Sequence, residues 1–229
     1  MIRAVIFDFD HTLYDRDLSL GKMLAPFKET TAAYINHALS DDELVKRIRE
    51  ADRAGVYVRG WQTIYEEYIK RDIFSTVPDY TEYMKHIRTH QPRSIVLFED
   101  TLPTLTKLRE MGLILGMLTN GAHASQTDKL QNTPVVPYFD KILIGGDLPA
   151  QKPHAVAFEA TCEALGVLPS EALFVGDNPV ADIEGAKNAG LTAVWMPYVK
   201  PYPAGVTPPD YIIDKLGDIP TLVEKLNQR

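Results

Sequence analysis

The chain has 229 residues, of which 45% are hydrophobic and 24% are charged, and its formal net charge is −7. This is the composition of an ordinary globular protein, and the length suits one large domain or one domain with an inserted module. The acidic balance lacks the basic footprint of proteins that bind duplex nucleic acid or anionic membranes, so we expect neither partner.

The first predicted element is a strand at residues 4–7, a short apolar run that stops at two acidic residues. A different pattern follows. Residues 18–93 contain no buried-strand run, and helical patterns cover residues 27–39, 42–54, 62–71 and 80–90. Ser40 with Glu43 has the spacing of a capping box. We therefore predict an all-helical module at residues 18–93, inserted into a domain made of residues 1–17 and 94–229.

The chain after the module alternates between strand and helix patterns. Short apolar runs at residues 113–118, 173–175 and 192–196 are typical of strands buried on both faces of a parallel sheet, and residues 141–144 and 211–213 are further candidates. Helical patterns at residues 102–108, 155–165 and 183–189 each precede a glycine, a common helix stop. This alternation predicts a doubly wound α/β fold.

Two carboxylates stand where the first strand ends. Asp8 and Asp10 are two residues apart, so they point the same way if the chain stays extended. They repel each other unless a cation or a proton lies between them. Because ligands bind at the carboxyl ends of strands in open α/β sheets, the pair suggests a magnesium site. Taken alone, the pair is also compatible with a strand-ending turn.

Further polar residues follow the later strands. Thr119 and Asn120 end the second strand and could present a hydroxyl and backbone N–H groups to an oxyanion, although the same residues are common in turns. Lys152 precedes a helix, a position that favours anions. Asp177 and Asp182 follow another strand and could complete an oxygen-rich cation site.

The order of these residues resembles the haloacid dehalogenase (HAD) superfamily. The resemblance covers residues 1–17 and about 95–229 and rests on Asp8-x-Asp10-x-Thr12, Thr119, Lys152 and Gly176-Asp177 followed by Asp182. It implies a Rossmann-like core with strand order 5-4-1-2-3, in which Asp8 forms an aspartyl-phosphate and Asp10 acts as general acid and then base. It further implies that Thr119 and Lys152 bind the phosphoryl oxygens. Asp8, the backbone carbonyl of Asp10, and Asp177 would hold Mg²⁺, with Asp182 as a further ligand or a neighbouring carboxylate.

The helical module resembles the C1 cap of the superfamily, because it lies between the first and second motifs. A cap that closes over the core would exclude water and select the substrate. Arg59 and Trp61 are candidate substrate contacts, although ordinary amphipathic helices also explain them.

The resemblance implies a magnesium-dependent phosphomonoester hydrolase that acts on a small phosphorylated metabolite such as a nucleotide or a sugar phosphate. Three alternatives remain open: a 2-haloacid dehalogenase, a phosphomutase and a catalytically silent binding module. The dehalogenase pattern lacks the second acid of the first motif, so Asp10 and Asp177 favour a phosphatase.

The chain also carries signals of its compartment. Its one cysteine, Cys162, excludes an intramolecular disulfide and favours a reducing environment. The apolar run at the N-terminus is too short for a signal peptide, and no stretch has the ~18 apolar residues of a membrane span. We expect a cytoplasmic monomer or small homo-oligomer.

Overall fold

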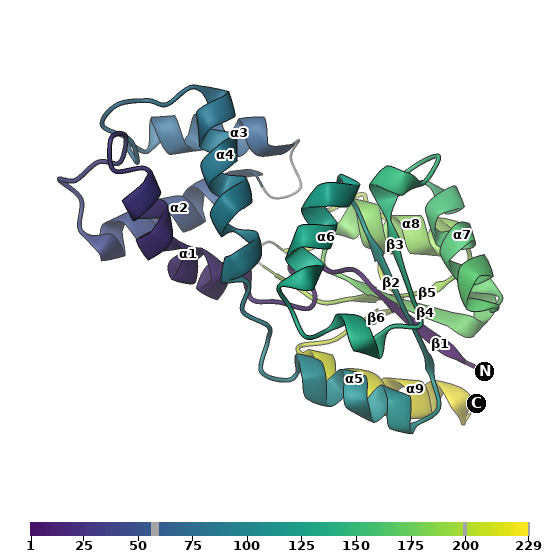
Figure 1. The fold of residues 1–229 in the computed structure, drawn as a ribbon. Helices are drawn as coiled ribbons and strands as arrows, with labels where there is room; N and C mark the ends of the chain where they lie inside the picture. Colours follow the sequence, from purple (N-terminus) through teal and green to yellow (C-terminus); the bar gives the residue numbers. More distant parts are fainter. Residues whose placement is uncertain (56–59, 199–200, 229) are drawn as a thin grey trace. The chain divides into compact units, whose positions relative to one another are not determined.

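A computed structural model describes residues 1–55, 60–198 and 201–228 and divides the chain into two compact units (Figure 1). The core unit consists of Met1–Asp15 and Leu97–Arg229, and the helical unit consists of Arg16–Val96. No helix among the described residues is long and apolar enough to cross a bilayer.

A parallel sheet forms the centre of the core unit. Among the described residues it has six strands in the order β3-β2-β1-β4-β5-β6, which confirms the predicted doubly wound, Rossmann-like α/β fold. All side chains of β1 and β4 are buried, which explains their continuous apolar runs. The strands are β1 (Ala4–Phe7), β2 (Ile114–Thr119), β3 (Lys141–Ile144), β4 (Ala172–Gly176), β5 (Thr192–Trp195) and β6 (Tyr211–Ile212).

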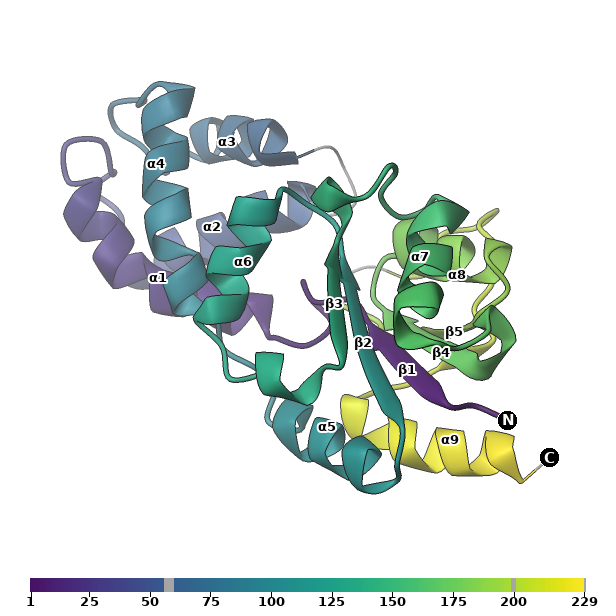
Figure 2. The same ribbon diagram turned by 45° about the vertical axis from the view of Figure 1, so that its right-hand side comes forward.

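Helices cover both faces of this sheet. In both ribbon views α5 and α9 lie side by side on one face, whereas α7 and α8 lie together on the other (Figures 1 and 2). Phe158 of α7 packs edge-on against Phe174 of β4, with 5.0 Å between ring centroids. The helices are α5 (Thr101–Glu110), α6 (His123–Gln131), α7 (Ala155–Leu165), α8 (Gly185–Asn188) and α9 (Ile219–Asn227).

The predicted helix at residues 183–189 differs from the structure. A π-helix at Pro179–Glu184 comes first, and α8 continues from it. The helical segment begins earlier than predicted because the Asn178 side chain accepts hydrogen bonds from the backbone N–H groups of Val180 (3.1 Å) and Ala181 (2.9 Å).

The helical unit contains α1 (Arg16–Thr30), α2 (Asp41–Gly55), α3 (Gly60–Lys70) and α4 (Tyr80–His90). Its core is rich in aromatic rings. The ring centroid of Phe27 lies 6.4 Å from those of Tyr68 and Phe74. The prediction of a helix at residues 27–39 was wrong. The first helix begins at Arg16 because its buried residues recur at helical spacing from there to Phe27, and the chain turns after Thr31, whose hydroxyl bonds to the Phe27 carbonyl (2.6 Å).

A buried ion pair joins the first two helices of this unit. The Arg16 guanidinium donates to both carboxylate oxygens of Asp52, and its closest nitrogen–oxygen distance is 2.6 Å. Asp17 also belongs here, because its carbonyl accepts a hydrogen bond from Arg49 (2.9 Å). At the C-terminal end of the helical unit, the Val96 N–H donates to the Ser19 hydroxyl (2.9 Å). These contacts explain why the units divide at 15/16 and 96/97, two or three residues from the expected crossings.

Candidate active site

The register of the sheet brings three sequence-predicted residues to one edge. Phe7 is level with Met117 of β2 and with Val175 of β4. Asp8 therefore follows β1 at the level where β2 and β4 approach their ends at Thr119 and Gly176. Because all three strands are parallel, their carboxyl ends meet at the same edge, with Asp177 directly after β4.

Lys152 connects the carboxylates of Asp8 and Asp182. Its Nζ lies 2.6 Å from Asp8 Oδ1 and 2.7 Å from Asp182 Oδ1, and all three side chains are buried. The pKa of Asp8 is raised to about 7, chiefly by burial; Lys152 opposes this shift, and Asp182 and Asp10 add to it. Burial lowers the pKa of Lys152, but the two carboxylates outweigh it, so that the pKa is raised overall and the lysine stays charged.

Three buried carboxylates form a candidate metal centre. Asp8, Asp177 and Asp182 each offer an oxygen, and these oxygens lie within 4.8 Å of one another. A hard divalent cation such as Mg²⁺ prefers oxygen donors, so this donor set fits it. Gly176 allows the Asp182 side chain to approach the end of β4 closely, because a Cβ at residue 176 would lie 2.5 Å from atoms of that side chain.

The Lys152 backbone is held by the loop that follows β2. Asn120 Nδ2 donates to the Lys152 carbonyl (2.9 Å), and Asn120 Oδ1 accepts from the Lys152 N–H (3.0 Å). The predicted substrate contact of Asn120 stays a prediction; the side-chain amide is already bonded to this backbone. Lys152 precedes α7 by three residues, and its ammonium group pairs with carboxylates and lies 5.2 Å from the Phe174 ring centroid.

The Asp10 side chain lies outside the acidic triad. Its carboxylate accepts hydrogen bonds from Lys129 Nζ (2.6 and 2.9 Å), Gln126 Nε2 (2.9 Å) and the Tyr14 hydroxyl. Gln126 Nε2 also donates to the Thr119 hydroxyl. The metal contact implied for Asp10 was its backbone carbonyl, so the position of its side chain does not conflict with that expectation.

Sequence reasoning missed Gln126 and Lys129. Both lie on α6, which was not predicted, and the two residues are 2% and 5% exposed. A signal was present: the two residues are three apart, the spacing of one helix face, directly after the Thr119 turn. Without a known helix, a glutamine and a lysine at this spacing are typical of a solvent-exposed face.

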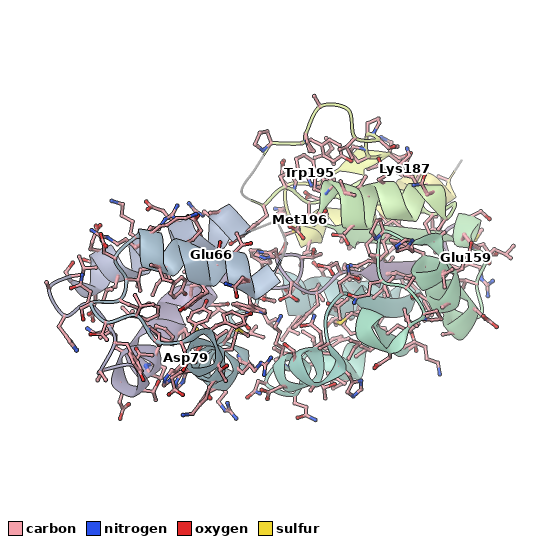
Figure 3. All side chains as sticks on the ribbon, turned by 90° about the horizontal axis from the view of Figure 1, so that it is seen from above. Glu66, Asp79, Glu159, Lys187, Trp195 and Met196 are labelled. Atoms are coloured by element: carbon pink, nitrogen blue, oxygen red, sulfur yellow. The ribbon has the colours of Figure 1, made fainter. Side chains whose placement is uncertain are left out.

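The backbone of Asp177 is fixed from the neighbouring strand. Trp195 Nε1 donates to the Asp177 carbonyl at 2.7 Å. Figure 3 shows Trp195 beside Met196 where β5 ends. This contact ties the loop after β4 to β5 and so restricts where the Asp177 carboxylate can lie.

The two predicted cap residues belong to a different part of the chain. Trp61 lies on α3 of the helical unit, and the Arg16 guanidinium carbon is 5.6 Å from its ring centroid. Arg59 lies outside the described residues. The predicted substrate contacts of both stay predictions.

Sequence comparison places the chain among known hydrolases. Residues 5–196 match the model of a family described as haloacid dehalogenase-like hydrolase. The chain is 30% identical over 197 residues to glyceraldehyde 3-phosphate phosphatase from Methanopyrus kandleri, which covers 85% of this chain and 83% of that protein. It is 35% identical over 135 residues to N-acylneuraminate-9-phosphatase from Mus musculus, which covers 58% of this chain and 54% of that protein.

Solved structures share the fold. The HAD-hydrolase YfnB from Bacillus subtilis, bound to magnesium, gives a TM-score of 0.78 at 23% identity and covers 97% of this chain and 98% of its own. L-2-haloacid dehalogenase from Xanthobacter autotrophicus gives a TM-score of 0.69 at 22% identity and covers 98% of this chain and 99% of its own. The fold alone therefore does not separate phosphatases from dehalogenases.

Proposed function

This chain belongs to the haloacid dehalogenase-like hydrolase family, and we propose that it is a magnesium-dependent phosphomonoesterase that acts through an aspartyl-phosphate on Asp8. The observation that carries the proposal is the buried cluster around Asp8. It combines a candidate nucleophile, the Lys152 ammonium group and two further carboxylates at the carboxyl edge of the sheet.

The charges of this cluster support a divalent cation. Asp8, Asp177 and Asp182 carry three negative charges when ionised, and Lys152 supplies one positive charge within the group. Two negative charges remain, which one divalent cation would balance. Bound there, Mg²⁺ would neutralise phosphoryl charge and reduce the repulsion between the ester and the attacking carboxylate.

The proposed reaction uses side chains of the core unit in two steps. In the first, an Asp8 carboxylate oxygen bonds to phosphorus as the phosphorus–oxygen bond of the leaving group breaks, and Asp10 delivers a proton to the leaving oxygen. In the second, Asp10 takes a proton from water as the water oxygen bonds to phosphorus and the bond to Asp8 breaks. Thr119 and Lys152 bind the equatorial oxygens and so stabilise charge in both transition states.

The names of two relatives support a class of substrate. One relative is a glyceraldehyde 3-phosphate phosphatase and the other is an N-acylneuraminate-9-phosphatase, and both names describe small phosphorylated metabolites. We propose that this chain also acts on a small phosphorylated metabolite, such as a sugar phosphate or a nucleotide.

The helical unit is proposed as a cap that selects this substrate. A site that recognised only the phosphoryl group would discriminate poorly between esters, so a second unit that contacts the rest of the substrate is needed for specificity. Trp61 and Arg59 are the proposed contacts, because an aromatic face and a guanidinium group suit the ring and the polar groups of such metabolites.

The alternatives have less support. A dehalogenase attacks carbon and needs no metal ion, so it has no evident use for Asp10 or for Asp177, one of the three carboxylates of the candidate metal centre. A silent binding module does not require a nucleophile, a lysine and a candidate acid–base residue at the same edge. A phosphomutase would use the same groups with a sugar hydroxyl in place of water as acceptor.

The test is a hydrolysis assay with p-nitrophenyl phosphate, with and without magnesium, followed by a screen of phosphorylated metabolites. Activity should require magnesium and should disappear when EDTA is in excess. Asp8→Asn should abolish both turnover and the acid-stable, hydroxylamine-sensitive phosphoenzyme. Full activity in excess chelator would contradict the metal assignment, and a phosphoenzyme in the Asp8→Asn protein would contradict the nucleophile.

A further inference from the structure

Helix α6 presents two buried polar side chains to the candidate acid–base residue. Gln126 and Lys129 are three residues apart and are almost fully buried. Burying an ammonium group costs several kcal/mol unless it is paired, so a lysine in this position needs a carboxylate partner. The partner of Lys129 is Asp10: Lys129 Nζ lies 2.6 Å from Asp10 Oδ1 and 2.9 Å from Asp10 Oδ2.

Gln126 links Asp10 to a second residue of the site. Its Nε2 donates to Asp10 Oδ2 at 2.9 Å and also to the Thr119 hydroxyl. Asp10 belongs to the loop after β1, whereas Thr119 is the last residue of β2. One amide group therefore sets the position of the candidate acid–base carboxyl relative to the candidate phosphate-binding hydroxyl.

The donors around the Asp10 carboxylate are of two kinds: one contacts both oxygens, and the others contact a single oxygen each. Lys129 bridges the two carboxylate oxygens, while Gln126 contacts Oδ2 and the Tyr14 hydroxyl contacts Oδ1. A carboxylate has about four acceptor positions. If a substrate oxygen or a water replaces one of the single donors, the bridging ammonium still holds the carboxyl group in place.

We propose that Lys129 and Gln126 are positioning residues for phosphoryl transfer. They orient the Asp10 carboxyl toward the leaving oxygen, and Gln126 also fixes the Thr119 hydroxyl relative to that carboxyl. The inference rests on the proposed function. Its physical basis is that proton transfer needs heavy atoms within about 2.6–3.2 Å, and that a misplacement of about 1 Å can cost 10²-fold in rate. Neither residue is proposed to touch the substrate, because both are almost fully buried and bond to Asp10 and Thr119 instead.

The experiment compares Lys129→Met and Gln126→Leu with two exposed controls. Lys107→Met on α5 and Gln131→Leu at the end of α6 make the same chemical changes at surface positions. For each protein, kcat/KM is measured with magnesium for p-nitrophenyl phosphate and for glycerol 2-phosphate. Nitrophenolate leaves without protonation, whereas a glycerol alkoxide needs a proton, so only the second ester depends on the aim of Asp10.

Lys129→Met should lower kcat/KM for glycerol 2-phosphate by about 10²-fold and for p-nitrophenyl phosphate by less than about 3-fold. Gln126→Leu should lower the first value as well, and should also weaken inhibition by inorganic phosphate, because Thr119 loses its bonding partner. Both controls should match the wild type. An equal loss with both esters, or no loss with either, would overturn the inference.

A second measurement does not depend on activity. A crystal structure of the Lys129→Met protein should show the Asp10 carboxylate displaced from its wild-type position, and an unmoved carboxylate would overturn the inference. A wild-type protein that hydrolyses neither ester would contradict the proposed function, while this structural comparison would still decide the role of Lys129.

Discussion

Gly176 is the position where the smallest substitution should do the most damage to the site. A Cβ at residue 176 would lie 2.5 Å from three atoms of the Asp182 side chain, whereas ordinary van der Waals contact begins at 3.4 Å. Asp182 has little freedom to move away, because Lys152 holds one carboxylate oxygen (2.7 Å) and the Asn178 N–H holds the other (2.9 Å). Gly176→Ala should therefore force Asp182 out of these bonds.

The size of the effect follows from these distances. Relieving the clash requires a shift of about 0.9 Å, which would lengthen a 2.7 Å hydrogen bond to about 3.6 Å, beyond the bonding limit. Hydrogen bonds to charged groups contribute about 1.5–3 kcal/mol each, so the loss of both would cost about 3 kcal/mol or more. For a protein of this size, each kcal/mol lowers the melting temperature by about 2–4 °C, which gives a decrease of roughly 6–12 °C.

Gly116→Ala is the matched control. Its Cβ would meet the end of the Leu165 side chain at 2.7 Å and Ile6 at 3.3 Å, so it disturbs the packing of β2 but not the acidic triad. Overpacking should destabilise the protein by about 1–3 kcal/mol and so lower its melting temperature, while kcat/KM should be kept when it is measured well below that temperature.

Thermal unfolding followed by circular dichroism, with phosphatase assays at 20 °C, separates the two glycine variants. Gly176→Ala should lose at least about 10-fold in kcat/KM even while fully folded, because 1.4 kcal/mol of lost transition-state stabilisation is enough. A Gly176→Ala protein with wild-type activity and melting temperature would refute the claim that Asp182 is held at this distance.

Three further outcomes are expected. Asp10→Asn should lower kcat by roughly 10²–10⁴-fold in steady-state assays, the usual contribution of general acid–base catalysis. Asp52→Asn removes the charge that faces the buried Arg16 and should destabilise the protein by about 3 kcal/mol in urea unfolding, whereas Asp41→Asn, in an exposed pair, should cost less than about 1 kcal/mol. Cys162 is buried, and burial raises its pKa to about 11; at pH 7.5 it stays protonated and should react with iodoacetamide only after unfolding.

The part of the site that the sequence predicted is the part made by strand ends. Asp8 and Asp177 each follow a short apolar run, and Thr119 closes another. Parallel strands bring their carboxyl ends to one edge, so the position of a residue along the chain is enough to predict that edge. The order of the strands came from the family resemblance, since short buried strands carry no pairing code of their own.

The parts that the sequence did not reveal depend on long-range partners. The buried face of α6 carries Gln126 and Lys129, so the helix lacks the apolar stripe by which amphipathic helices are recognised. The same holds for the start of α1, where Arg16 is buried because Asp52 neutralises it. A charged residue is predicted to lie on the surface unless its partner is known. Here Asp52 lies 36 residues from Arg16 and Asp10 lies 119 residues from Lys129 in the sequence.

These buried charges indicate what fixes the geometry of the site. Lys152 bonds to Asp8 and Asp182, and Lys129 bonds to Asp10, so each ammonium group joins elements that are far apart in the chain. Such pairs add little net stability, since desolvation offsets most of the attraction, but a single lost partner leaves an uncompensated charge. The apolar sheet can therefore tolerate packing changes that the charge network cannot. Removing one charge should therefore lower both activity and stability, whereas replacing both members of a pair with apolar residues should cost activity but little stability, and this difference would separate the two contributions.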